Sequence, residues 1–187
     1  MVGGTSMSRI GKKPIALPAG VDFAVSNQNV VTVTGKLGKL EQKVSKLLKI
    51  EVVDNQIIVS CLNNSREANA AHGLYRTLIA NMVEGVTNGF TKNLIINGVG
   101  YKVFDKNGAI EFKIGYSHPV LFTAPEGITL SCPTATEVKV FGFDKQKVGQ
   151  VAANIRAIQP VEPYHAYGIR YSDEVVIRKE GKTAAKK

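Results

Sequence analysis

The sequence lacks the features that mark membrane, secreted or zinc-binding proteins. No apolar run among its 187 residues approaches the roughly 18 that a membrane-spanning helix needs. The N-terminus has no apolar signal core, so we expect no secretory signal. The two cysteines, Cys61 and Cys132, lie far apart and outside any CxxC pattern, which indicates reduced thiols and no zinc framework.

Catalytic patterns are missing as well. No two of the three histidines, His72, His118 and His165, have metal-ligand spacing, so we expect no metal and no cofactor. Ser117 and His118 are neighbours without a nucleophile elbow, and Gly98-Val-Gly100 lacks the remaining glycine of a dinucleotide fingerprint. The sequence therefore predicts a protein that is not an enzyme, with His72 on a helix surface or partly packed.

Positive charge is the first functional clue. The chain has 24 Lys and Arg against 15 Asp and Glu, a net charge of +9, which favours a polyanionic partner. The charge gathers at two arms: Arg9, Lys12 and Lys13 stand without an acid in residues 8–13, and residues 178–187 have five basic residues and one acid. Such arms commonly bind phosphates, and solvated termini without a partner are the alternative. No basic amphipathic helix is evident, which disfavours a membrane surface.

An internal repeat predicts the fold. Residues 17–35 match residues 124–142 without a gap, and each copy indicates a Pro-Gly turn, a strand, a second turn and a strand of alternating apolar residues. Five positions are identical: Pro18/Pro125, Gly20/Gly127, Val31/Val138, Val33/Val140 and Gly35/Gly142. At equal strand phase, the two valine pairs should face inward in equivalent strands.

Helical spacing follows in both halves. A helix is expected near 65–84, with Asn64 and Glu67 as its capping box and glycines at 85 and 89 as its end, and another near 145–158 after Asp144. Strands are expected near 40–45, 50–53 and 57–61, with a hairpin turn at 105–108. We therefore predict an α+β fold of two similar small domains, each an antiparallel-rich sheet packed on one main helix. The expected division is an N-terminal extension (1–7), domains at 8–82 and 83–177, and a basic tail (178–187).

Six segments, in consistent order from Met7 to about Lys182, carry a resemblance to a known family. They are similar to the bacterial form of ribosomal protein six of the large subunit. No single motif decides the resemblance, and the order of all six makes it specific. The segments are residues 8–15, 81–90, 98–102, 115–119, 144–153, and 162–164 with 168–171.

The resemblance implies a structural, non-catalytic constituent of the large ribosomal subunit that supports translation in the cytoplasm. It implies binding to large-subunit (23S-type) rRNA, chiefly through the C-terminal half, near the sarcin–ricin loop and the base of the factor-binding stalk. Neighbouring ribosomal proteins, with translational GTPases nearby, are the other expected partners, and no homo-oligomer is expected. A free-standing regulatory RNA-binding protein is the alternative.

Candidate RNA contacts come from the matching motifs and from the two arms. Arg156 has a second interpretation, as a cap for the last carbonyls of its helix. The motif residues are Tyr116, Ser117, His118, Lys145, Gln146, Gln150, Arg156, Tyr164, Arg170 and Lys179, and the arms add Arg9, Lys12, Lys13 and Lys182.

One loop departs from the family pattern. Where the family usually has Lys-Gly-Lys, this chain has His165-Ala166-Tyr167, and Gln159 replaces a residue that is usually basic. The loop has therefore lost up to three positive charges, so we expect either a stacking contact in place of a phosphate contact or a weaker grip on RNA.

Overall fold

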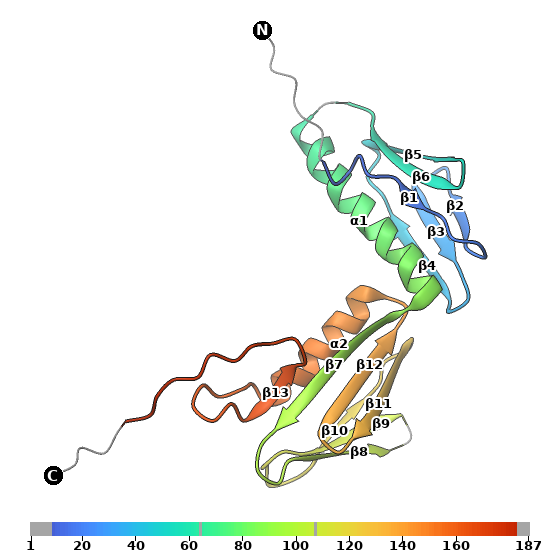
Figure 1. Cartoon of the computed structure of the whole chain (residues 1–187). Coiled ribbons are helices and arrows are strands. Elements are labelled where there is room, and N and C mark those ends of the chain that lie inside the picture. Colours follow the sequence, from blue (N-terminus) through green and yellow to red (C-terminus); the bar gives the residue numbers. More distant parts are fainter. Residues whose placement is uncertain (1–8, 64, 107, 183–187) are drawn as a thin grey trace, which may run out of the picture. The chain divides into compact units, whose positions relative to one another are not determined.

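The computed structural model describes residues 9–63, 65–106 and 108–182, and its contacts separate two units. The N-terminal unit runs to Gly89 and also takes in residues 143–145, while the C-terminal unit holds residues 90–142 and those from 146 onward. In each unit, one long helix packs on antiparallel sheet (Figure 1). The α+β fold class is therefore confirmed.

The N-terminal unit has two three-stranded sheets, ordered β2-β3-β4 and β1-β6-β5. Short turns join most consecutive strands, so the pairing is antiparallel throughout. Helix α1 follows the last strand and lies along these sheets (Figure 1). The elements are β1 (Ile15–Ala16), β2 (Asp22–Val25), β3 (Val30–Thr34), β4 (Lys39–Lys43), β5 (Leu48–Val53), β6 (Gln56–Cys61) and α1 (Arg66–Asn88).

The C-terminal unit has a four-stranded sheet ordered β11-β12-β7-β13 and a three-stranded sheet ordered β10-β9-β8. Helix α2 covers one face of the larger sheet, where Val148, Val151 and Ile155 join its core. The elements are β7 (Phe90–Asn97), β8 (Lys102–Lys106), β9 (Ala109–Lys113), β10 (Val120–Thr123), β11 (Ile128–Thr134), β12 (Glu137–Gly142), α2 (Lys145–Ile158) and β13 (Gly168–Tyr171).

The internal repeat is confirmed by the strands that it predicted. β2 and β3 form one hairpin, and β11 and β12 form its counterpart. On β3, Val31 and Val33 are both 0% exposed, and on β12, Val138 and Val140 are 1% and 0% exposed. Complete burial of a valine contributes about 1.5–3 kcal/mol, so each pair anchors the core of its unit.

Helix α1 differs from the expectation at both ends. Its N-cap is Ser65, whose Oγ accepts the Ala68 N–H at 3.1 Å, while Asn64 lies outside the described residues. Gly85 does not break the helix and is buried within it. The helix ends at Asn88, and Gly89 caps it with a φ of 73° that glycine adopts readily.

The expected position of His72 is wrong. Its side chain is 1% exposed and belongs to the buried face of α1 rather than to its surface. The Nε2–H donates to the backbone oxygen of Val59 on β6 at 2.8 Å. Because a carbonyl only accepts, Nε2 carries a proton in this bond, which joins α1 to the adjacent sheet.

Helix α2 begins at Lys145 and ends at Ile158, as its periodicity predicted. The hairpin between β8 and β9 pairs Lys106 with Ala109 and uses Gly108 at a φ of 90°, while residue 107 lies outside the described part of the chain. Strand β1 was not among the strands named from the sequence; its two residues, Ile15 and Ala16, pair with Ile57 and Gln56 on β6.

Candidate nucleic-acid interface

Tyr116 joins two of the candidate segments. Its hydroxyl lies 2.7 Å from the Ile158 carbonyl oxygen and 2.6 Å from Gln159 Oε1, and it donates its single proton to one of them. The loop that carries Tyr116, Ser117 and His118 therefore lies beside the C-terminal end of α2. All three of these side chains are exposed. Tyr116 retains 48% exposure, so part of its ring can still contact a partner.

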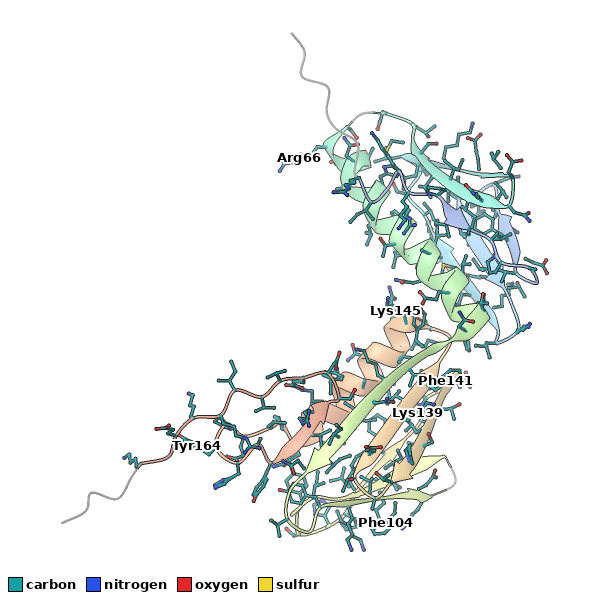
Figure 2. All side chains as sticks on the ribbon, viewed as in Figure 1. Arg66, Phe104, Lys139, Phe141, Lys145 and Tyr164 are labelled. Carbon is teal, nitrogen blue, oxygen red and sulfur yellow. The ribbon has the colours of Figure 1, made fainter. Side chains whose placement is uncertain are left out.

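The loop between α2 and β13 is organised by Glu162. Its carboxylate accepts the Tyr164 N–H at 3.2 Å and the His165 N–H at 2.7 Å. Burial alone would raise the pKa of Glu162, but these backbone donors outweigh it and lower the pKa. Tyr164 is 52% exposed, and its place in this loop is labelled in Figure 2.

The same loop contains His165-Ala166-Tyr167, the segment that departs from the usual family pattern. Ala166 has a φ of 61°, in the left-handed region that favours the glycine usual in the family. The loop is nevertheless fixed, because Asn97 Nδ2 donates to the Ala166 carbonyl at 3.0 Å. His165 and Tyr167 stack with ring centroids 5.3 Å apart, so an aromatic pair occupies the positions of two usual lysines.

Arg156 is paired within the protein. Its Nε and one terminal nitrogen donate to the two carboxylate oxygens of Glu174 at 2.9 and 2.6 Å. The guanidinium also lies 5.8 Å from the ring centroid of Tyr171, which is partly buried against the core. These contacts support a structural role, different from the helix-end capping considered above. The RNA contact of Arg156 stays a prediction.

Glu174 is the centre of this cluster. The hydrogen bonds from Arg156 outweigh partial burial and lower the pKa of Glu174, and the Tyr171 N–H contributes at 3.1 Å. The same pairing raises the pKa of Arg156. Arg170 donates to the backbone oxygen of Glu174 at 3.1 Å, so the segment after β13 is tied to the unit at several points.

The solvent side of α2 is polar. Lys145, Gln146 and Gln150 are all exposed on it. Gln150 Nε2 donates to Asn154 Oδ1 at 2.9 Å, one turn further along the helix. Lys145, which groups with the N-terminal unit, donates from Nζ to Asn81 Oδ1 at 3.0 Å.

Basic residues also line the segment that follows β13. Lys179 and Lys182 are exposed, and the Lys179 N–H donates to the Pro163 carbonyl at 2.8 Å. That bond brings the start of the basic tail beside the loop that carries Tyr164. The arm residues Arg9, Lys12 and Lys13 are exposed as well, but they belong to the N-terminal unit.

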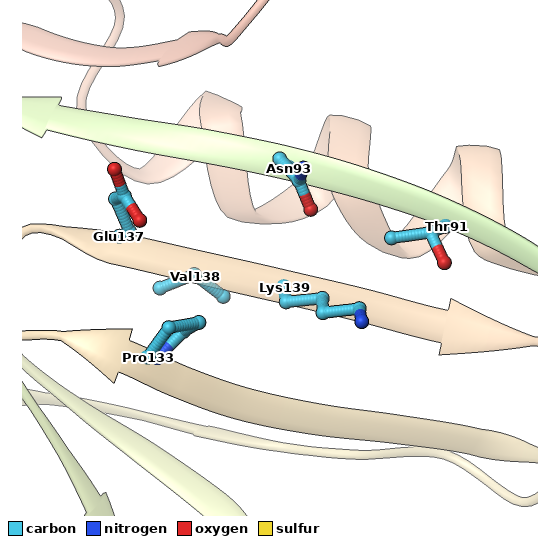
Figure 3. A pocket seen from close by; sticks show the side chains of 6 residues that line it. All are labelled: Thr91, Asn93, Pro133, Glu137, Val138 and Lys139. Atoms are coloured by element: carbon cyan, nitrogen blue, oxygen red, sulfur yellow. The ribbon is translucent and has the colours of Figure 1, made fainter.

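A shallow hollow on the larger sheet of the C-terminal unit was not singled out in the sequence (Figure 3). Its volume is about 170 Å³, and its lining comes from β7, β11 and β12. On β12, exposed polar residues alternate with buried valines, and this alternation is the signal that marks such an open face. Glu137 and Lys139 both line it, so the hollow has no clear preference for phosphate. The lining residues are Thr91, Asn93, Pro133, Glu137, Val138 and Lys139.

Comparison with known proteins identifies the family to which this chain belongs. The family model for ribosomal protein L6 matches residues 17–89 and again residues 97–172. The chain belongs to the ribosomal protein L6 family. Each of the two matched segments of this L6-family chain contains one copy of the internal repeat, residues 17–35 or 124–142, which fits a duplication.

Full-length relatives agree with this assignment. The chain is 49% identical over 180 residues to large ribosomal subunit protein uL6 of Chlorobium phaeobacteroides. This alignment covers 96% of this chain and 100% of the relative. It is 46% identical to the uL6 protein of Prosthecochloris aestuarii over 97% of this chain and 100% of that protein. The uL6 protein of Clostridium acetobutylicum is 49% identical, over 95% and 99% of the respective chains.

Family membership confirms the resemblance and the expectation that the protein is not an enzyme, because L6-family proteins are structural components of the ribosome.

Within residues 9–63, 65–106 and 108–182, no group of three or more His, Cys, Asp or Glu side chains is arranged to hold a metal ion. None of the helices in the described part of the chain is both long and apolar enough to cross a membrane.

Proposed function

We propose that this protein is a structural constituent of the large ribosomal subunit in the cytoplasm, where it binds rRNA and neighbouring ribosomal proteins. Within the subunit, it binds 23S-type rRNA chiefly through its C-terminal unit, near the sarcin–ricin loop and the base of the factor-binding stalk. Translational GTPases act nearby, and the protein acts as a single copy rather than as a homo-oligomer.

One observation carries the proposal: candidate segments of the C-terminal unit are held in pairs by hydrogen bonds. Tyr116 connects its loop to the end of α2, and Lys179 connects the tail to the loop that carries Tyr164. Exposed aromatic rings can stack on bases or ribose, while lysines pair with phosphates. A surface that is ordered before binding loses less conformational entropy when RNA arrives.

Salt dependence of binding tests the phosphate contacts. Binding of the full chain to protein-free 23S rRNA should weaken steeply between low and moderate salt, with each neutralised phosphate adding about 0.7–0.9 to the slope of log K against log salt. The double variant Lys179→Gln with Lys182→Gln should lower that slope by about 1.4–1.8. An unchanged slope would refute the contribution of the tail.

Two lysines in the N-terminal unit provide a matched control. Lys39 and Lys49 pair with Glu41 and Glu51 at 2.7 and 2.6 Å, so their charges are already balanced locally. The double variant Lys39→Gln with Lys49→Gln removes the same charge and should leave the slope unchanged. Sucrose-gradient sedimentation separates the alternative function, because a free-standing regulator would not travel with large subunits.

A further inference from the structure

The basic segment from Arg9 to Pro14 is built onto α1. Gly11 is buried, whereas Arg9, Lys12 and Lys13 are exposed on either side of it. A Cβ at position 11 would lie 2.4 Å from His72 Nδ1, a distance that no real side chain tolerates. Only glycine therefore lets this backbone lie directly on the imidazole ring.

His72 is a rigid support for that contact. Its ring is 1% exposed, and its bond to the Val59 carbonyl at 2.8 Å prevents the imidazole from moving aside. Nδ1 is buried without a hydrogen-bond partner in the structure. A buried ring nitrogen without a partner costs free energy, so the close packing of Gly11 on this ring carries a penalty.

Arg76 holds the other end of the segment. It lies four residues after His72 and therefore on the same face of α1. Its Nε donates to the Lys13 carbonyl at 2.9 Å, and a terminal nitrogen donates to the Pro14 carbonyl at 3.3 Å. The Lys13 N–H donates to the Ile10 carbonyl at 3.2 Å and closes a turn. The backbone between Ile10 and Pro14 is thus fixed at several points.

The charges around this turn are unbalanced. No ion pair within residues 9–63, 65–106 and 108–182 uses Arg9, Lys12, Lys13 or Arg76. Arg76 satisfies its donors with neutral carbonyls, so its positive charge adds to those of the turn. Two other lysines of the unit differ in this respect, because Lys39 and Lys49 each pair with a glutamate.

We propose that Gly11, His72 and Arg76 are positioning residues that hold Arg9, Lys12 and Lys13 as an ordered cationic turn for the sugar-phosphate backbone of RNA. This proposal rests on the proposed function and adds a second RNA contact, in the N-terminal unit. Contacts between cationic side chains and phosphate oxygens carry no sequence information, so this contact should be independent of the RNA sequence. Holding the turn in advance removes the entropy cost of ordering it on binding.

The test compares variants of the full chain on protein-free 23S rRNA across a salt series. Replacing Arg9, Lys12 and Lys13 together by glutamine should lower the salt slope by about 2.1–2.7. Gly11→Ala keeps every charge, so it should weaken binding about 3–10-fold with little change in slope, because only the ordering of the turn is lost. Thermal unfolding of each variant checks that the unit remains folded.

Arg76→Gln and Arg66→Gln form a matched pair. Both remove one arginine from α1, but Arg66 is an exposed first-turn residue that holds no part of the arm (Figure 2). Arg76→Gln should weaken binding more than Arg66→Gln does, and it should speed tryptic cleavage after Arg9 and Lys12. Because Arg76 is partly exposed and its partners are backbone carbonyls of the arm, this variant should fold even where Gly11→Ala does not.

Each outcome decides the proposal. If the wild-type chain does not bind the rRNA, the proposed function and this inference both fall. If it binds and the triple variant binds equally well, the turn faces solvent or a protein neighbour and makes no RNA contact. If the triple variant weakens binding but Arg76→Gln and Gly11→Ala match Arg66→Gln, the cations act without being positioned, and the role of the three positioning residues is refuted.

Discussion

Replacing Glu174 by glutamine should loosen the segment after β13 and destabilise the C-terminal unit. The carboxylate accepts two hydrogen bonds from Arg156 and one from the Tyr171 N–H. A glutamine keeps the shape and one acceptor oxygen but loses the charge and the second acceptor. A hydrogen bond to a charged group contributes about 1.5–3 kcal/mol, whereas an exposed ion pair contributes at most about 1 kcal/mol.

The solvent exposure of Arg156 and Glu174 decides whether their contribution is nearer that of a charged hydrogen bond or that of an exposed ion pair. The Arg156 side chain is 38% exposed and that of Glu174 is 25% exposed, so solvent screens part of the interaction. We therefore expect a loss of about 1–1.5 kcal/mol. For a unit of this size, that loss lowers the melting temperature by roughly 4–12 °C. Glu137→Gln, which removes an exposed and unpaired carboxylate from the same unit, is the control and should change little.

The pH dependence gives an independent check. The pKa of Glu174 is lowered in the folded protein, so its stabilising contribution is complete above the pKa of the unfolded chain and is lost as pH falls through the folded pKa. Calorimetry should therefore show a difference between wild type and Glu174→Gln at pH 7 that shrinks in acid. A difference that is absent at pH 7, or equally large well below pH 4, would refute the reasoning.

Two further predictions concern the loop before β13 and the start of α1. Replacing His165 and Tyr167 by lysine should steepen the salt dependence of rRNA binding by about 1.4–1.8 if the loop faces phosphates, and an unchanged slope in a filter-binding series would show that it does not. Ser65→Ala should cost about 1 kcal/mol in urea unfolding, because the Ala68 N–H loses its acceptor, and a loss below a few tenths would mean that another group caps the helix.

Local sequence patterns predicted most of the strands and helices of the fold. The alternation around Val31 and Val138 predicted two equivalent buried strands, because period-two burial is a property of the strand itself. The spacing of Val148, Val151 and Ile155 likewise predicted α2 to its terminal residues. Such patterns are readable because each one is complete within a few residues of sequence.

The missed features depend on residues far apart in the chain. His72 is buried because Val59 and Gly11 close over it, and nothing near position 72 in the sequence indicates either partner. The pairing of Arg156 with Glu174 spans 18 residues and a loop, so helical spacing alone could not suggest it. Sequence reasoning found the exposed basic residues, but it could not tell which of them are held in place.

Strand β7 has a consequence for how the protein is made. It begins at Phe90, directly after the cap of α1, yet both of its neighbours, β12 and β13, come much later in the chain. During synthesis, the strands and helix of the N-terminal unit are complete before β7 has a partner. β7 then has two open edges until Gly142 has emerged and one open edge until Tyr171 has emerged. Nascent chains halted between these points should be the ones most prone to aggregate, because unpaired strand edges template association.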